Sequence, residues 1–299
     1  MTTAKTGSAM PPHSPEANGL KRVHSMTFEY GLRNHTVQDI RQLKGQRQLT
    51  EVALFHAEEA YAVAEAGIDC MTMRYTPDAP GLARAARAAA PHTFMNCSLP
   101  LTSVTSCQEA RRLAFDAMEL GADSIVCQWS PRFIEAVAEC GVPVRGHIGL
   151  VPRRSTWTGG LRAVGKTVDQ AMDLWRQIKD LENAGAWAVE CEVIPSRILA
   201  ELSKRTSLVT VSLGSGPGDV QFMFAQDILG DGQGPFPRHS KQYCDLQAMR
   251  DRMQVMRVQA ITEFASDVHE NRFPSPAHEV AVDDAVVSAF VEAIDDCQR

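Results

Sequence analysis

The feature that most constrains the fold is a repeated alternation of short apolar runs with helical patterns. Several of the helical patterns end at a glycine, and short connections lead from them to the next apolar run. This punctuation is typical of βα units, in which a buried strand is followed by a helix that covers it. The predicted strands are Leu49–Phe55, Cys70–Tyr75, Thr93–Leu99, Ser124–Trp129, Val144–Leu150, Trp187–Ile194 and Leu208–Leu213. The predicted helices are Thr36–Lys44, Ala57–Ala66, Leu82–Ala90, Cys107–Leu120, Pro131–Cys140, Val168–Ala184, Pro195–Lys204 and Val220–Leu229.

Seven such units, with a possible eighth strand near Ile228-Leu229, predict an α/β protein with a closed (β/α)8 TIM barrel. The alternative is an open, doubly wound sheet. No G-x-G-x-x-G follows the first strand, which argues against a dinucleotide-binding sheet of that kind. A chain of 299 residues with 44% hydrophobic residues is large enough to bury the core of one barrel.

The two ends differ from the middle in composition. Residues 1–24 are predicted to be a disordered tail, because the start is rich in Pro, Ser, Ala and Gly and lacks the apolar segment of a signal peptide. Residues 25–299 are predicted to be a single TIM-barrel domain with C-terminal helices. Cys244–Val268 has a strong helical pattern with a methionine stripe, which we expect to pack on the barrel or on a neighbouring subunit of a homo-oligomer.

Composition also limits the partners. The net charge is −6, and no Lys/Arg stripe with interleaved aromatic residues indicates a nucleic-acid surface. The sequence contains no run of about 18 apolar residues, so no membrane span is expected. The eight cysteines form no C-x-x-C pair and four of them lie in strand-like runs, which is typical of buried thiols in a reducing cytoplasm. We therefore expect a cytoplasmic protein that acts on a small molecule.

In a TIM barrel the active site lies at the C-terminal ends of the strands. His147 lies near the end of the predicted strand Val144–Leu150, between Gly146 and Gly149, and a Gly-rich loop follows this strand. In the strand Trp187–Ile194, Glu190 and Glu192 share one face and the apolar residues share the other, so both carboxylates are expected to point into the barrel. The turn Gly214–Gly218 is either an anion-binding nest or a tight βα turn.

Strand parity also predicts an ion pair below this site. Arg145 and His147 share a face, which places Arg145 at about the depth of Glu190 and His147 at about the depth of Glu192. Two like charges in a dry interior need a partner, so we predict that Arg145 pairs with Glu190 and leaves Glu192 free for chemistry. In the alternative, Glu190 lies in solvent at a strand edge.

Several ordered motifs resemble the ketopantoate hydroxymethyltransferase family, clearly over Cys140–His278 and more loosely before it. They are Gly146–Pro152, Thr158–Gly165, Glu192–Pro195, Ser212–Gly216, Pro237–Lys241 and Phe273–His278. The resemblance implies a TIM barrel of the phosphoenolpyruvate/pyruvate superfamily, a large oligomer and a step of pantothenate biosynthesis. It implies hydroxymethyl transfer from 5,10-methylenetetrahydrofolate to an α-keto acid such as 3-methyl-2-oxobutanoate, through an enolate. Glu192 falls on the family's general base and His147 on its histidine near the substrate.

The same resemblance exposes departures at the family's Mg²⁺ site. Arg74-Tyr75-Thr76 stands where the family has its first metal-binding aspartate, Ser98 where it has the second, and Gln128 where it has a supporting glutamate. Mg²⁺ requires oxygen anions, so binding of Mg²⁺ is doubtful and no metal ligand is predicted. Asp78 offers one carboxylate in the gap. Arg74 offers a positive charge in place of the ion, although parity leaves open whether Arg74 or Tyr75 faces inward.

These observations predict a hydroxymethyltransferase-like enzyme in which Glu192 is the base and His147 orients the substrate. The predicted substrate-binding residues are Tyr75, Arg74, Ser98, Gln128, Ser212 and Gly214. Two alternatives remain. One is a metal-independent C–C lyase or aldolase that acts on another keto acid. The other is a catalytically silent relative that serves in binding or assembly.

Overall fold

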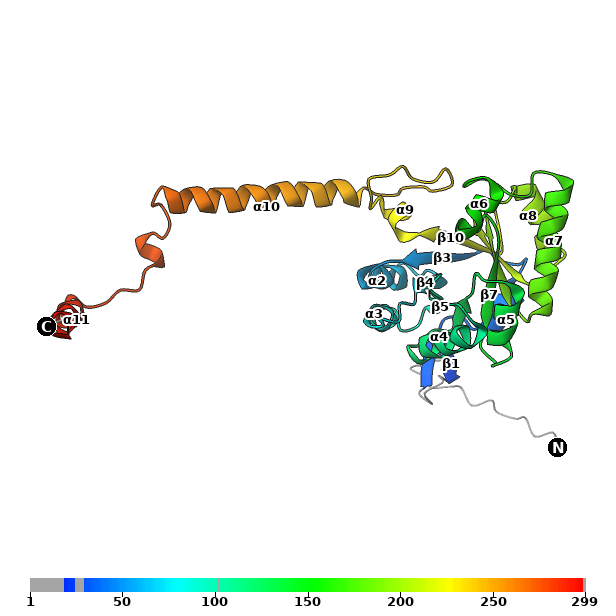
Figure 1. The fold of residues 1–299 in the computed structure, drawn as a ribbon, viewed down its shortest axis with the longest axis horizontal. Helices are drawn as coiled ribbons and strands as arrows, with labels where there is room; N and C mark the ends of the chain where they lie inside the picture. Colours follow the sequence, from blue (N-terminus) through cyan, green and yellow to red (C-terminus); the bar gives the residue numbers. More distant parts are fainter. Residues whose placement is uncertain (1–18, 25–29, 102, 298–299) are drawn as a thin grey trace, which may run out of the picture. The chain divides into compact units, whose positions relative to one another are not determined.

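The computed structural model describes residues 19–24, 30–101 and 103–297. The chain divides into two compact units, Met1–Cys244 and Asp245–Arg299. In the first unit, eight parallel strands close into a barrel in the order β10-β3-β4-β5-β6-β7-β8-β9. Figure 1 labels five of them, β3, β4, β5, β7 and β10. The predicted (β/α)8 barrel is confirmed. The strands are β3 Leu49–Leu54, β4 Cys70–Arg74, β5 Phe94–Ser98, β6 Ser124–Val126, β7 Val144–Gly149, β8 Ala188–Glu192, β9 Val209–Leu213 and β10 Val220–Phe224.

Helices cover the outside of the barrel (Figure 1). Those of the first unit are α1 Val37–Leu43, α2 Ala57–Glu65, α3 Gly81–Ala89, α4 Cys107–Glu119, α5 Pro131–Ala138, α6 Ser155–Thr158, α7 Val168–Asn183, α8 Ser196–Ser203 and α9 Ala225–Leu229. A 3-10 turn, Pro152–Arg154, precedes α6. Local signals fix several helix starts: the side chains of Thr36, Ser106 and Thr167 each accept a backbone hydrogen bond at the N-cap of α1, α4 and α7.

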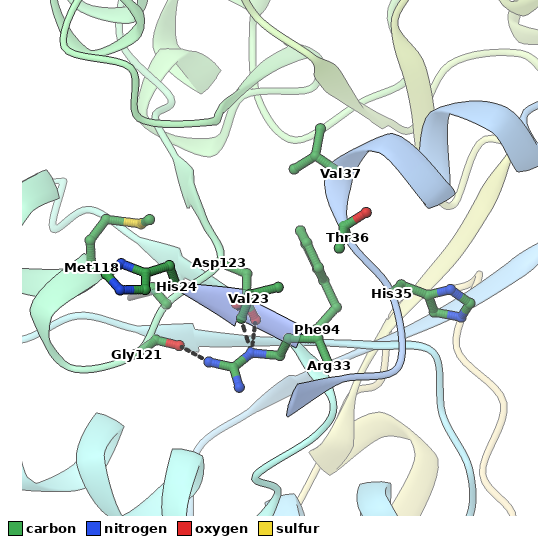
Figure 2. A pocket seen from close by; sticks show the side chains of 11 residues that line it. Val23, His24, Arg33, His35, Thr36, Val37, Phe94, Met118, Gly121 and Asp123 are labelled. Atoms are coloured by element: carbon green, nitrogen blue, oxygen red, sulfur yellow. Dashed lines mark hydrogen bonds and ion pairs between the residues drawn. The ribbon is translucent and has the colours of Figure 1, made fainter. Parts of the chain in front are cut away.

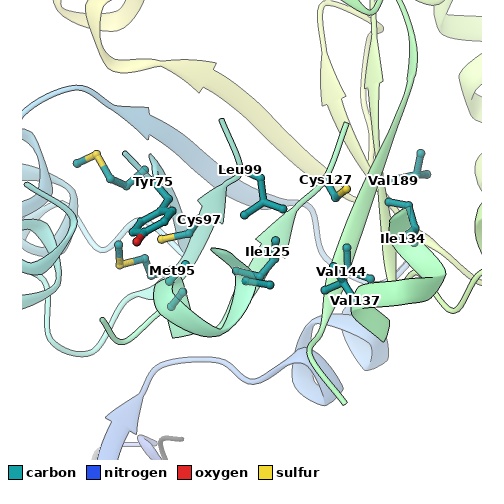
Figure 3. Packing of buried hydrophobic residues seen from close by; sticks show 14 of the residues in the cluster. Tyr75, Met95, Cys97, Leu99, Ile125, Cys127, Ile134, Val137, Val144 and Val189 are labelled. Atoms are coloured by element: carbon teal, nitrogen blue, oxygen red, sulfur yellow. The ribbon is translucent and has the colours of Figure 1, made fainter. Parts of the chain in front are cut away.

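The barrel has an outer and an inner hydrophobic core, because alternate strand residues point to opposite faces. Figure 3 shows part of the outer core, where Val144 and Val189 of the strands lie near Ile134 and Val137 of α5. The inner core fills the lower lumen with Leu49, Cys70, Phe94, Trp187, Ala188, Val209 and Val220, among others. The lower lumen is therefore filled by apolar side chains.

The eighth strand lies earlier than the sequence predicted. Val220–Phe224 is strand β10, which pairs with β9 and β3 and closes the barrel. The prediction of a helix over Val220–Leu229, with a possible strand near Ile228-Leu229, was wrong, since only Ala225–Leu229 is helical. Closure explains the difference: the free edges of β9 and β3 supply hydrogen-bond partners that a local pattern does not reveal.

An unpredicted antiparallel pair, β1 Lys21–His24 and β2 Tyr30–Arg33, lies at the N-terminal end of the barrel. The sequence placed Lys21–His24 in a flexible tail, but the structure makes them a strand. Arg33 anchors this pair: its Nε lies 2.7 Å from Oδ1 of Asp123, and Arg87 holds the same carboxylate at 2.8 Å. Figure 2 shows Arg33 and Asp123 at a cavity of about 170 Å³. Polar networks at this end of a TIM barrel serve stability.

The second unit contains α10 Leu246–His269, a 3-10 turn Pro276–His278 and α11 Asp284–Cys297. The helix predicted over Cys244–Val268 is confirmed within two residues at its start. Although α10 and α11 are described throughout, neither contains a buried residue. The expected packing of this segment thus stays a prediction. In the described part of the chain, no helix is both long and apolar enough to cross a membrane.

Candidate active site

Strands β7 and β8 bring the central acid and imidazole groups together at the C-terminal end of the barrel. Nε2 of His147 lies 3.1 Å from Oε2 of Glu192. The strand register pairs His147 with Glu190, and Gly149 with Glu192. The expectation that His147 is level with Glu192 was therefore wrong by two residues, because neighbouring barrel strands are staggered. The carboxylate of Glu192 reaches His147 all the same.

Directly below lies a buried ionic network centred on Arg145, whose side chain is 1% exposed. Its Nη2 lies 3.1 Å from Oε2 of Glu190, which confirms the predicted ion pair. Its Nη1 lies 2.7 Å from Oε2 of Glu51 on β3, a partner that the sequence analysis missed. Burial acts to lower the pKa of Arg145, but the charges of Glu51 and Glu190 outweigh it and raise the pKa above its usual value.

Glu51 was detectable in the sequence. It alternates with Leu49 and Ala53 of the first predicted strand, and both of these lie in the inner core. The same alternation that was applied to Glu190 and Glu192 would have indicated an inward carboxylate here. What parity does not show is that Glu51 also accepts hydrogen bonds from Asn96 Nδ2, at 3.1 Å, and from the Thr72 hydroxyl. These donors satisfy the buried charge from two more strands.

The backbone around Glu192 is fixed from both sides. Gly149 adopts φ +89°, and a Cβ there would lie 2.3 Å from the carbonyl oxygen of Glu192, so only glycine fits this close approach. That same oxygen accepts a 2.8 Å hydrogen bond from the Leu150 amide. Val193 has φ 50°, a left-handed conformation that costs a β-branched residue about 1–3 kcal/mol. Strain of this size directly after a candidate base is typical of functional sites.

Two predicted substrate-binding residues, Arg74 and Ser98, lie on the inward faces of their strands, and a third, Gln128, lies beyond the end of its strand. Arg74 shares the face of Cys70, which lies in the inner core, so the side chain that faces inward is Arg74 and not Tyr75. Arg74 is exposed at the end of β4, and Ser98 is its register partner on β5. Gln128 follows β6 and lines a cavity of about 450 Å³ together with His147.

Two other predicted residues face away from the lumen. Tyr75 is 5% exposed and lies in the outer core, near Met95 and Cys97 in Figure 3, where burial raises its pKa. Ser212 is fully buried, and its hydroxyl donates to the carbonyl oxygen of Gly216. Both predictions of substrate contact are therefore corrected, because each residue stands one position out of register with the inward face.

The Gly214–Gly218 turn has a structural role. The hydroxyl of Ser215 donates to the Cys191 carbonyl at 2.8 Å and accepts from the Ile194 amide at 2.8 Å, which joins the end of β9 to β8. Gly214 has φ +67°, and a Cβ there would lie 2.6 Å from Nδ1 of His239. Gly214 and Glu192 line a cavity of about 990 Å³ whose other polar residues include Arg162, Lys166, Arg238 and His239. A basic mouth of this kind suits an anionic substrate.

Comparison with known proteins identifies the family of this chain. The model of the family described as ketopantoate hydroxymethyltransferase matches residues 78–276. The 3-methyl-2-oxobutanoate hydroxymethyltransferase of Thermus thermophilus is 31% identical over 265 residues, which cover 81% of this chain and 98% of the relative. The enzyme of the same name from Pyrobaculum calidifontis is 29% identical over 267 residues, covering 82% and 98%.

Among solved structures, 2,3-dimethylmalate lyase, a member of the PEP mutase/isocitrate lyase superfamily, has the same fold. It superposes with a TM-score of 0.52 at 13% identity and covers 76% of this chain and 89% of the lyase. At this identity the likeness concerns the barrel alone. The match of the family model and the identity to whole relatives together show that the chain belongs to the ketopantoate hydroxymethyltransferase family.

Proposed function

We propose that this protein transfers a hydroxymethyl group to an α-keto acid, 3-methyl-2-oxobutanoate, with 5,10-methylenetetrahydrofolate as the one-carbon donor. The observation that carries the proposal is the position of Glu192. Its carboxylate stands at the end of β8, is 13% exposed, lines the large basic cavity and lies beside His147. A partly buried carboxylate at such a strand end is placed to accept a proton from a bound substrate.

The reaction balances with the residues present. Glu192 takes the proton from the carbon next to the keto group, which leaves an enolate. The enolate carbon forms a bond to the methylene carbon of the donor as one of the two carbon–nitrogen bonds at that carbon breaks. Water breaks the second carbon–nitrogen bond and supplies the hydroxyl group. The proton held by Glu192 and the remaining proton of that water go to the two nitrogens of the released tetrahydrofolate. His147, beside Glu192, orients the keto acid.

The Mg²⁺ ion that the family resemblance implies does not fit this chain. Its expected ligand positions carry a guanidinium, a hydroxyl and an amide, from Arg74, Ser98 and Gln128. None of these is the oxygen anion that Mg²⁺ prefers, and Asp78 is exposed in the loop after β4. We propose instead that Arg74, which faces the lumen, holds the substrate carboxylate and stabilises the enolate, with Ser98, Gln128 and Gly214 around the substrate.

We further propose the compartment in which the protein acts. The eight cysteines are all free, which favours a reducing compartment, and we place the protein in the cytoplasm. Burial raises the pKa of Cys97 to about 12 and of Cys127 to about 11, so these thiols stay protonated and inert.

We also propose that the protein is a homo-oligomer, because α10 carries exposed methionine and valine side chains.

The test is deuterium exchange of 3-methyl-2-oxobutanoate in D₂O, followed by proton NMR of the carbon next to the keto group. We expect exchange with the wild-type protein in the presence of EDTA. In Glu192→Gln the rate should fall at least about 100-fold, the lower limit for loss of a general base. Glu139→Gln is the matched control, because the Glu139 side chain is 61% exposed on the surface. Absence of exchange in the wild type, or equal exchange in Glu192→Gln, would contradict the proposal.

A further inference from the structure

His147, Glu190 and Glu192 form a compact group with the composition of a metal site. One ligand atom from each lies within 4.8 Å of the others. The grouping follows from the fold: His147 and Glu190 are register partners on β7 and β8, and Glu192 comes two residues later on the same face. Acidic side chains often gather without binding an ion, so a second observation is needed.

The imidazole of His147 provides it. The residue is 8% exposed and its side chain 1%, yet both ring nitrogens are buried without a hydrogen-bond partner among the described residues. Nε2 is within ion-pair distance of Glu192, but the two groups are not aligned as a hydrogen bond. Leaving a buried polar group unpartnered costs about 1–3 kcal/mol. A ring nitrogen without a partner, beside two carboxylates, is the arrangement in which an imidazole binds a metal ion.

The charged side chains around His147 also favour a bound cation. Glu51, Glu190 and Glu192 contribute three carboxylates whose side chains are 2%, 6% and 13% exposed. Among the ion pairs of the described residues, Arg145 is the only guanidinium or ammonium group that meets them. Three carboxylates therefore meet one guanidinium and one imidazole in a mostly buried site. A divalent cation bound by the imidazole nitrogen and two of the carboxylates adds positive charge where the acids outnumber the bases.

We propose that His147, Glu190 and Glu192 bind a divalent first-row transition-metal ion, at a site distinct from the family's Mg²⁺ position. One imidazole and two carboxylates form a mixed nitrogen and oxygen set that suits ions such as Mn²⁺, Fe²⁺ or Zn²⁺. Arg145 holds the Glu190 carboxylate at 3.1 Å and so orients a ligand, as outer groups of metal sites do. Glu192, whose side chain is 13% exposed, lines the cavity of about 990 Å³, and His147 lines the cavity of about 450 Å³.

The site has a consequence for catalysis. Glu192 is both the proposed base and a proposed ligand, and an oxygen bound to a cation no longer accepts a proton. The ion therefore acts as an inhibitor of the proposed proton transfer. Binding itself does not depend on the proposed reaction, so the two ideas fail separately.

The experiment is a titration of the full-length protein, freed of metal with EDTA and dialysed, with Mn²⁺ followed by electron paramagnetic resonance. Mn²⁺ is the probe because the exposed thiols of Cys140, Cys244 and Cys297 would take up softer ions. We expect one Mn²⁺ per chain. In Glu190→Gln and His147→Ala the affinity should fall at least about 10- to 100-fold, the loss that removal of even an outer partner causes.

Two controls keep the test decisive. Glu139→Gln should bind Mn²⁺ as the wild type does. In Glu190→Gln, Arg145 keeps its pair with Glu51, so the barrel should remain folded, which a thermal melt checks. Pulsed resonance should detect a nitrogen ligand in the wild type that disappears in His147→Ala. No binding up to millimolar Mn²⁺, or equal binding in all variants, would overturn the site. If the ion binds and Glu192 is the base, Mn²⁺ should slow deuterium exchange. Deuterium exchange by a protein that binds no Mn²⁺ would overturn the metal site and would still support the proposed function.

Discussion

At the scale of single residues, Arg145 determines whether the floor of the site is stable. Its guanidinium is fully buried and compensates Glu51 and Glu190 at the same time. It also lies over the ring of Phe222, with 5.7 Å between Cζ and the ring centroid. Removing one partner of a buried ion pair is far more harmful than replacing the whole pair, because the remaining charge stays desolvated.

We therefore expect Arg145→Met to lower the free energy of unfolding by about 3–5 kcal/mol. Urea denaturation followed by circular dichroism measures this. The matched control is Arg112→Met, which removes an exposed pair with Asp116 and should cost about 0.5 kcal/mol or less. Equal losses in the two variants would show that the buried network does not stabilise the barrel.

At the scale of elements, the carboxylate of Asp69 joins the start of β4 to its neighbours. It accepts hydrogen bonds of 2.9 Å from both the amide and the hydroxyl of Thr50 on β3, and it lies 3.0 Å from Nε2 of His35 ahead of α1. Burial acts to raise the pKa of Asp69, but the contacts with His35, Thr50 and Arg47 outweigh it. The pKa falls from 3.8 to about 2.

This shift predicts a pH dependence of stability. Because the folded-state pKa is lower than the unfolded value, the stabilisation is fully present above pH 3.8 and is lost as the pH falls through about 2. The full contribution is about 2 kcal/mol. Urea unfolding between about pH 6 and about pH 2 should show a smaller pH dependence for Asp69→Asn than for the wild type. Parallel curves for the two proteins would contradict the assignment.

At the scale of the whole molecule, α10 carries apolar side chains that the second unit itself does not bury. Met249, Met253, Met256 and Phe264 recur at spacings that place them on one face of α10, and each is at least 47% exposed. A contiguous apolar stripe of this kind indicates an interaction surface. The stripe supports the proposed homo-oligomer.

We expect sedimentation of the full chain to give a mass that is a multiple of 32.8 kDa. Met253→Lys should lower that mass, because a charge in an apolar interface is costly to bury. Gln254→Lys, one residue along the same helix, is the control and should leave the mass unchanged. A monomeric wild type, or equal effects of the two changes, would exclude α10 as the surface of assembly.

The local sequence pattern correctly predicted part of this fold and part of the site. The seven predicted strands and most helices follow from period-two and helical patterns, and the inward direction of Glu190 and Glu192 follows from parity alone. The same rule left open whether Arg74 or Tyr75 faces inward. Ser212 was placed among the substrate contacts because it lies at the end of a predicted strand, without the parity that directs it outward. The eighth strand was missed because its partners, β9 and β3, are distant in sequence.

The sequence by itself determined the barrel, the family and the presence of one cation among the buried acids of the lumen, since burial periodicity and residue type are local properties. Only the tertiary structure decided which acids share Arg145, that His147 stands level with Glu190, and that the ring nitrogens of His147 have no hydrogen-bond partner among the described residues. The stagger of strands around a closed barrel fixes these distances. No single strand carries that information, because stagger is a property of all eight together.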